Sequence, residues 1–278
     1  MTTNQSSWLK EHSLIAYFIL IYVVSWTIWS PIVASAQGWV KWNVPYALYY
    51  FGSFGPMLAA LIITALTEGR FGIRDLLRRT IKWRMEVRYY AFAILVPMGL
   101  FTLARLLNRV ITSEWPNLNL LGKADYLPYL GPLGVLGLWL FTYGLGEETG
   151  WRGFALPHLQ KNRSAASATL ILAMLWATWH LPAFLFRDTY VELGLFGFPM
   201  FAIMMIFSTM VFTWLYNSTQ GSVFIVIIFH AVFNWLSVSE AGGQFAVSLM
   251  SAPLVLWALY VPRRYGQENA APVAKQIA

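Results

Sequence analysis

The chain has 278 residues, of which 58% are hydrophobic and 11% are charged, whereas an ordinary soluble domain carries roughly 25% charged residues. It contains no cysteine, which excludes disulfides, thiolate metal sites and a cysteine nucleophile. The formal net charge is +7.

Long apolar stretches with few or no charges follow one another along the chain. Stretches of about 18 or more such residues predict transmembrane helices. Eight are found, at residues 14–34, 45–66, 89–107, 127–146, 165–186, 195–216, 221–238 and 244–261. The sequence therefore predicts an all-α, multi-pass transmembrane helical bundle of about eight spans.

Basic residues are distributed unequally between the two sides of these spans. Between the second and third spans lie Arg70, Arg74, Arg78, Arg79, Lys82, Arg84 and Arg88. The opposite side receives only Lys41, Arg105, Arg109, Lys123 and Arg187. The positive-inside rule then predicts a protein of the cell membrane with both termini in the cytoplasm. We accordingly interpret the positive charge as topology and contact with anionic lipid, and expect no nucleic-acid partner.

Three regions follow from this pattern. Residues 1–126 are expected to hold N-terminal transmembrane helices and a basic cytoplasmic loop. Apolar residues among the arginines of that loop predict a short amphipathic helix on the inner membrane surface: Phe71, Ile73, Leu76, Leu77, Ile81 and Trp83. Residues 127–262 are expected to form a membrane core with four helices. Residues 263–278 read as a disordered cytoplasmic tail, because they are polar and of low hydrophobicity.

Ionisable residues inside the spans are concentrated in the second half of the chain. Insertion of an Asp, Lys or Arg at the centre of a span costs roughly 2.5–3.5 kcal/mol. Such residues therefore usually face the protein interior for a functional reason. Glu147, Glu148 and Arg152 stand at the cytoplasmic end of the fourth span, within GLGEETGWR. His180 lies in the fifth span, within LAMLWATWH, and His230 in the seventh.

The spacing of these residues indicates how they cooperate. Glu148 and Arg152 are four residues apart, in the favourable acid-before-base order on a helix. Glu147 points about 100° away, so we expect one acid to be neutralised by arginine and the other to become more basic. A carboxylate of that kind suits a general base. His230 and Asn234, also four apart, share one helix face.

Purely structural interpretations compete with this one. An acid pair can be solvated charge at the membrane interface, and an intramembrane histidine can be satisfied within the bundle. Trp176 and Trp179 are most simply packing or interfacial aromatic residues. Gly144, Gly146 and Gly150 are most simply sites of close helix packing. The conjunction of the acids and both intramembrane histidines in one half of the chain favours a functional site.

Three short motifs carry a resemblance to a known family. EETGWR matches E-E-x-x-x-R, WATWH resembles F-x-x-x-H with Trp176 in the aromatic position, and HAVFN matches H-x-x-x-N. In this order and spacing, residues 127–240 resemble the CPBP or Abi family of intramembrane peptidases. That family includes CAAX proteases, which trim prenylated proteins, and bacteriocin-processing and immunity proteins.

The resemblance implies a role for each motif residue. Glu147 would activate a water that His180 helps to hold, while His230 and Asn234 would donate hydrogen bonds to the oxyanion. The second glutamate and the arginine of the first motif would shape the site. The chain would then be an intramembrane endopeptidase acting on a membrane-anchored substrate, such as a prenylated CAAX-like protein or a leader peptide. A non-catalytic membrane immunity or binding protein and a proton-coupled small-solute transporter are the alternatives.

No cofactor is assigned from the sequence, and zinc is an alternative. Glu147, His180 and His230 could supply three ligands of an open zinc site. The CAAX branch of the family is understood as glutamate-dependent and metal-free, and that mechanism is favoured here.

His180 and His230 are expected at different depths from the cytoplasmic ends of their spans. His180 lies about 22 Å into its span and His230 about 13 Å into its own, at a rise of about 1.5 Å per residue. Convergence with Glu147 requires either a fifth helix that begins well below the membrane or an acid pair that is drawn inward.

The charge asymmetry yields a topology test. Reporter fusions after residues 80 and 270 should give a cytoplasmic signal, and a fusion after Lys41 should give an external one. A cytoplasmic signal at Lys41 would contradict the orientation.

Overall fold

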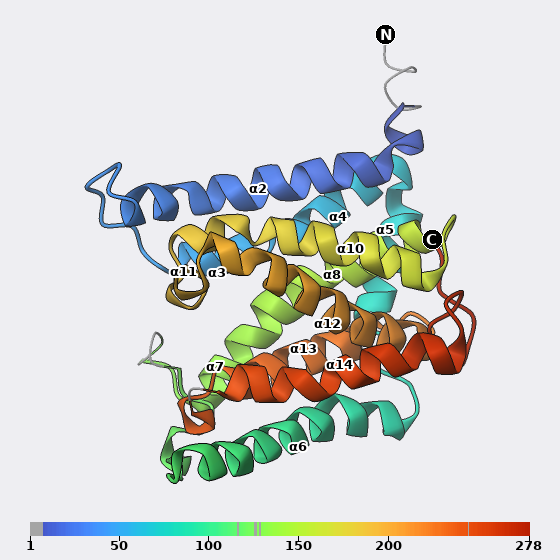
Figure 1. Cartoon of the computed structure of the whole chain (residues 1–278). Coiled ribbons are helices and arrows are strands. Elements are labelled where there is room, and N and C mark those ends of the chain that lie inside the picture. Colours follow the sequence, from blue (N-terminus) through green and yellow to red (C-terminus); the bar gives the residue numbers. More distant parts are fainter. Residues whose placement is uncertain (1–7, 116, 125–126, 128, 244) are drawn as a thin grey trace.

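The computed structural model describes residues 8–115, 117–124, 127, 129–243 and 245–278, and within them it contains helices and no β-strand (Figure 1). The all-α prediction is therefore confirmed. The longer helices are α2 (Ser13–Ala36), α4 (Gly55–Thr67), α5 (Gly69–Thr80), α6 (Val87–Thr112), α10 (Ala165–Trp179), α12 (Phe198–Ser218), α13 (Val223–Ser237) and α14 (Ala246–Tyr265). The shorter ones are α3 (Leu48–Gly52), α7 (Pro132–Trp139), α8 (Glu148–Gly150), α9 (Leu156–Gln160) and α11 (Asp188–Leu193).

Among the described residues, six helical segments are long and apolar enough to cross a membrane. They are Ser13–Ala36, Leu48–Thr67, Val87–Thr112, Ala165–Leu185, Asp188–Ser218 and Ala246–Tyr265. Each corresponds to one of the eight expected spans, and α13 is a shorter apolar helix at the seventh. Pro128 and Gln244, which belong to two expected spans, lie outside the described residues. The chain is a multi-pass helical membrane protein, and the beginning of α2 and the C-terminus lie at the same end of the bundle (Figure 1).

The fourth expected span belongs to a longer helical path through the centre of the bundle. Residues 132–160 are helical without interruption, passing from α7 through α8 to α9. Two parts of this path are π-helical, η2 (Leu140–Glu147) and η3 (Trp151–Ala155). Because π-helical turns place side chains at angles that a regular α-helix does not, such turns are frequent at functional sites.

Glycines bring the N-terminal helices against this central path. A Cβ on Gly150 would lie 2.5 Å from the backbone of Pro56, and one on Gly146 would lie 2.8 Å from the Ser53 carbonyl oxygen. A Cβ on Gly144 would lie 2.7 Å from Ile227 of α13. The interpretation of these three glycines as close-packing sites is therefore confirmed.

The first helix is also bonded to the second half of the chain. Tyr22 Oη donates to the Leu175 carbonyl at 2.8 Å, and Trp26 Nε1 donates to the Trp179 carbonyl at 3.0 Å. Buried residues of α2 and α10 belong to one hydrophobic core. The regions 1–126 and 127–262 thus share their packing.

The residues after α14 differ from the disordered tail that their composition predicts. The Ala165 amide at the beginning of α10 donates to the Glu268 carbonyl at 2.9 Å. Asn217 Nδ2 donates to the Asn269 carbonyl at 2.9 Å, and Ala270 is fully buried. The tail supplies acceptors to helix-end and side-chain donors that would otherwise lack them, and composition carries no information about such pairing.

We predict that Gly150→Ala destabilises the protein by about 1–3 kcal/mol, because the added methyl group overlaps the Pro56 backbone. Gly137→Ala in α7 is the matched control, since no atom lies within 4 Å of the added Cβ. That change should be neutral or stabilise the helix by up to about 1 kcal/mol. Unfolding in detergent measures both, and equal losses would contradict the packing argument.

Candidate active site

A buried acid, a buried arginine and a histidine form the centre of the site. Arg152 Nη1 lies 3.0 Å from Glu148 Oε1 and 2.9 Å from Oε2. His230 Nδ1 lies 2.7 Å from the same Oε1. Glu148 and Arg152 are fully buried, and His230 is 7% exposed. The four-residue spacing of Glu148 and Arg152 thus forms the expected ion pair, and His230 of α13 completes it.

Aromatic rings enclose the guanidinium of Arg152. Its Cζ lies 4.3 Å from the ring centroid of Trp176 and 4.5 Å from that of Phe212. Among the described residues, Arg152 Nε and Nη2 have no hydrogen-bond acceptor. A cation–π contact that is shielded from water stabilises by about 2 kcal/mol or more. These contacts therefore compensate part of the free energy that is lost because the two N–H groups have no acceptor.

Trp176 connects Glu147 to His180. Its Nε1 donates to Glu147 Oε2 at 3.0 Å, and its backbone carbonyl lies 2.8 Å from His180 Nδ1. The Trp176 ring also contacts the His230 ring, with centroids 5.6 Å apart. Glu147, His180 and His230 therefore surround one indole, although they come from three helical segments.

The hydrogen bonds determine which nitrogen of His180 carries a proton. A carbonyl oxygen can only accept, so Nδ1 must be the donor to Trp176. In the neutral ring, Nε2 of His180 is then an acceptor. It can hold a water molecule by accepting one of its protons.

Asn234 is less closely connected to this group. It lies on α13 one turn after His230 and is half-buried. Within the described part of the chain, its side-chain amide makes no hydrogen bond, in contrast to the paired Glu148, Arg152 and His230.

The acid pair does not stand at a helix end, as the sequence suggested. The helical path continues beyond it to Gln160, and Glu147 is only 3% exposed. Both acids thus meet the histidines inside the bundle, and which of the two ways reconciles the depths of His180 and His230 in the membrane stays a prediction. Glu148 can lie there because Arg152 and His230 share its charge; an unpaired carboxylate could not.

Sequence reasoning treated Trp176 as a packing or interfacial residue; it does pack in the core, but it also makes a polar contact that was not expected. Its indole N–H contacts Glu147 and its ring covers Arg152. The sequence did contain a sign of this contact, because tryptophan stands where the F-x-x-x-H motif has phenylalanine. Of these two side chains, only tryptophan has an N–H donor.

Arg187 and its tyrosine neighbours were also missed. Arg187 Nη1 donates to the hydroxyls of Tyr49 and, at 3.0 Å, Tyr143. The Tyr143 ring stacks on the His230 ring with centroids 6.2 Å apart, and the ring centroids of Tyr190 and His180 are 6.0 Å apart. No sequence motif joins these residues, so only the folded chain reveals them.

The zinc alternative was tested against the side-chain arrangement. Among the described residues, no three His, Asp or Glu side chains converge closely enough to share a metal ion. Both histidines direct Nδ1 to protein acceptors, His180 to a carbonyl and His230 to Glu148, which leaves Nε2 of each histidine to face a ligand. Glu147, His180 and His230 do not form a preformed three-ligand site in this arrangement, and no metal step is derived.

These features define a class of protein. It is a multi-pass helical membrane protein with two buried acids, a buried arginine and two histidines at the centre of its bundle. Residues 129–236, which contain all of these groups, match a family model described as Type II CAAX prenyl endopeptidase Rce1-like.

A curated relative agrees with this match. The chain is 21% identical over 225 residues to a CAAX prenyl protease 2 from Methanococcus maripaludis, an alignment that covers 77% of this chain and 80% of the relative. Both comparisons support a place in the CPBP/CAAX protease family and, with it, a membrane-embedded endopeptidase.

The buried pair leads to a stability prediction. Arg152→Gln and Glu148→Gln should each destabilise the protein by about 3–5 kcal/mol, because each leaves the other charge buried without its partner. The double variant should be more stable than either single variant, as measured by unfolding in detergent.

The exposed Glu86–Arg88 pair provides the control, since solvent screens it and Glu86→Gln should change little. If the losses of the two single variants simply add in the double variant, the groups do not act as a pair.

Proposed function

We propose that the chain is an intramembrane endopeptidase that hydrolyses a peptide bond with a glutamate-activated water. The observation that supports this most directly is Glu147, buried and oriented by Trp176, in a group with two histidines. Residues 127–262 would be the catalytic core, and Glu147 the general base. The Trp176 bond engages Oε2, so Oε1 is the oxygen that takes the proton.

The reaction follows from these groups. A water held by His180 Nε2 loses one proton to Glu147 as its oxygen attacks the scissile carbonyl carbon. The carbonyl π electrons move to oxygen and form the oxyanion. Collapse of this intermediate breaks the C–N bond, and Glu147 returns the proton to the departing amine. One water is consumed and the products are a carboxylic acid and an amine.

Stabilisation of the oxyanion falls to His230 and Asn234. His230 uses Nδ1 for Glu148, so it can donate to the oxyanion only from Nε2, which then has to carry a proton as well. The Asn234 amide is the second donor, one turn along α13. Glu148 and Arg152 shape the site by holding His230.

The substrate we propose is a peptide or protein anchored in the membrane. The relative named CAAX prenyl protease 2 supports a prenylated, CAAX-like substrate, with leader peptides as the other candidate. Protein reconstituted in liposomes and given a peptide library with and without a lipid anchor tests this assignment. Equal cleavage of both sets would contradict the requirement for an anchor.

Glu147→Gln should abolish hydrolysis while folding and substrate binding persist, because glutamine keeps the shape but removes the basicity. Asn234→Ala should lower turnover by roughly 10²–10³, the loss typical of one oxyanion donor. Glu114→Gln, at an exposed position away from the site, is the control for loss of an acid. Wild-type turnover in Glu147→Gln would overturn the mechanism.

The zinc alternative predicts a different outcome in the same assay. A chelator would inhibit, added zinc would restore activity, and His180→Ala would lose about one metal per chain. The mechanism proposed here predicts unchanged turnover in the presence of a chelator.

A further inference from the structure

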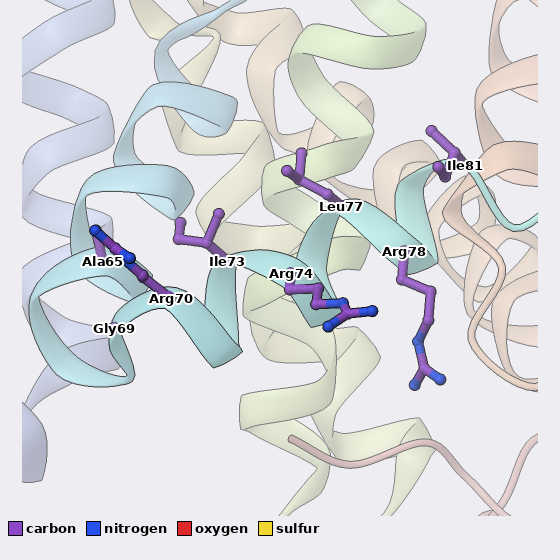
Figure 2. A pocket seen from close by; sticks show the side chains of 8 residues that line it. All are labelled: Ala65, Gly69, Arg70, Ile73, Arg74, Leu77, Arg78 and Ile81. Atoms are coloured by element: carbon purple, nitrogen blue, oxygen red, sulfur yellow. The ribbon is translucent and has the colours of Figure 1, made fainter.

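A groove on the outer face of α5 combines arginines with apolar side chains. It has a volume of about 660 Å³ and is lined by Ala65, Gly69, Arg70, Ile73, Arg74, Leu77, Arg78 and Ile81. In Figure 2, Arg74 and Arg78 extend from one side of the helix, and Ile73 and Leu77 extend from the other. The helix thus presents a basic row beside an apolar row.

The neighbouring spans place α5 at the membrane surface. Its first residue, Gly69, follows the candidate span Leu48–Thr67 after a single residue, and the span Val87–Thr112 begins shortly after it ends. A helix tethered to a span at each end cannot leave the bilayer boundary. This is the position of an interfacial helix, with apolar side chains at the acyl chains and basic ones at the headgroups.

The inner face of α5 is fastened to the protein, so the direction of the groove is set. Leu76 is 1% exposed and packs where a Cβ on Gly153 would be. Arg79 Nη1 donates to the Gly153 carbonyl at 2.7 Å and to Tyr216 Oη at 3.2 Å. Because Leu76 and Arg79 face the bundle, the arginines at positions 70, 74 and 78 face away from it.

The charges on the outer face lack sufficient acidic partners. Arg78 is paired with Asp75 at 2.9 Å, whereas Arg70 and Arg74 form no ion pair within the described residues. Nearby, burial lowers the pKa of the Lys82 ammonium, and the positive charge of Arg78 lowers this pKa further. An uncompensated positive row beside apolar side chains is complementary to an anionic headgroup with its acyl chain.

We propose that this groove binds an anionic phospholipid of the surrounding bilayer. Its phosphate lies among Arg70, Arg74 and Arg78, which recur about every 6 Å along the helix. One acyl chain lies against Ile73, Leu77 and Ile81. The site is separate from the catalytic group, and its occupancy does not depend on the proposed peptidase function.

A labelled cysteine can test the groove directly, because the chain has no cysteine of its own. Phe71→Cys carries a fluorophore beside the groove, where the native side chain is 87% exposed. Leu256→Cys on α14, at a position 71% exposed, is the matched control. Single protein molecules are reconstituted in phosphatidylcholine nanodiscs that contain a minor fraction of phosphatidylglycerol. In separate samples, the acyl chains of one lipid or the other carry bromine, which quenches the fluorophore.

The label at position 71 should be quenched more by brominated phosphatidylglycerol than by an equal amount of brominated phosphatidylcholine, whereas position 256 should show no preference. Arg70→Gln/Arg74→Gln/Arg78→Gln should reduce the preference at position 71 about tenfold or more, because each basic residue strengthens anionic-lipid binding roughly fivefold and Arg78 shares its charge with Asp75. Thermal unfolding verifies that the variant folds. If it does not, Arg70→Gln/Arg74→Gln keeps the Arg78–Asp75 pair and should show a smaller loss.

A second triple variant distinguishes the groove from general attraction. Arg84→Gln/Arg263→Gln/Arg264→Gln removes the same charge outside the groove and should keep the preference. An equal loss in this variant would show that diffuse charge attracts the lipid, and the site would be refuted. Absence of any preference at position 71 in otherwise native protein would also refute it.

Discussion

The arrangement of the site depends on one constraint: two full charges, on Glu148 and Arg152, lie where no water reaches them. Burial of either charge alone would destabilise the fold strongly. The pair can be buried only when its geometry is good and further partners contact it. His230 supplies one partner, and the rings of Trp176 and Phe212 supply others. This single requirement brings α10, α12 and α13 to the central helical path.

The packing of the first half follows from the same central path. A helix that carries charges through the middle of the bundle must be covered on all sides. α4 approaches it closely at Gly150 and the turn before α4 does so at Gly146, and α2 closes over α10 with bonds to two of its backbone carbonyls. The N-terminal helices, which carry no motif residue, therefore enclose the group of buried acids, arginine and histidines.

Trp176 illustrates how closely function and packing are related in this site. Its ring packs against Arg152 and His230, its N–H orients Glu147, and its carbonyl orients His180. A change at this position would alter the surroundings of Glu147, His180 and the ion pair together. Aromatic identity in a motif is therefore a chemical property as well as a steric one.

The sequence by itself determined the all-α membrane class, the close-packed glycines and the pairing of Glu148 with Arg152, because composition and short helical spacings are local properties. Only the tertiary structure decided the burial of the acids, the bond from His230 to Glu148 and the packing of the last residues. These depend on partners far away in the chain: His230 lies 82 residues from Glu148, and the Trp176 indole lies 29 from Glu147. No local pattern specifies which distant donor will meet a buried charge; that is decided when the helices pack and exclude water.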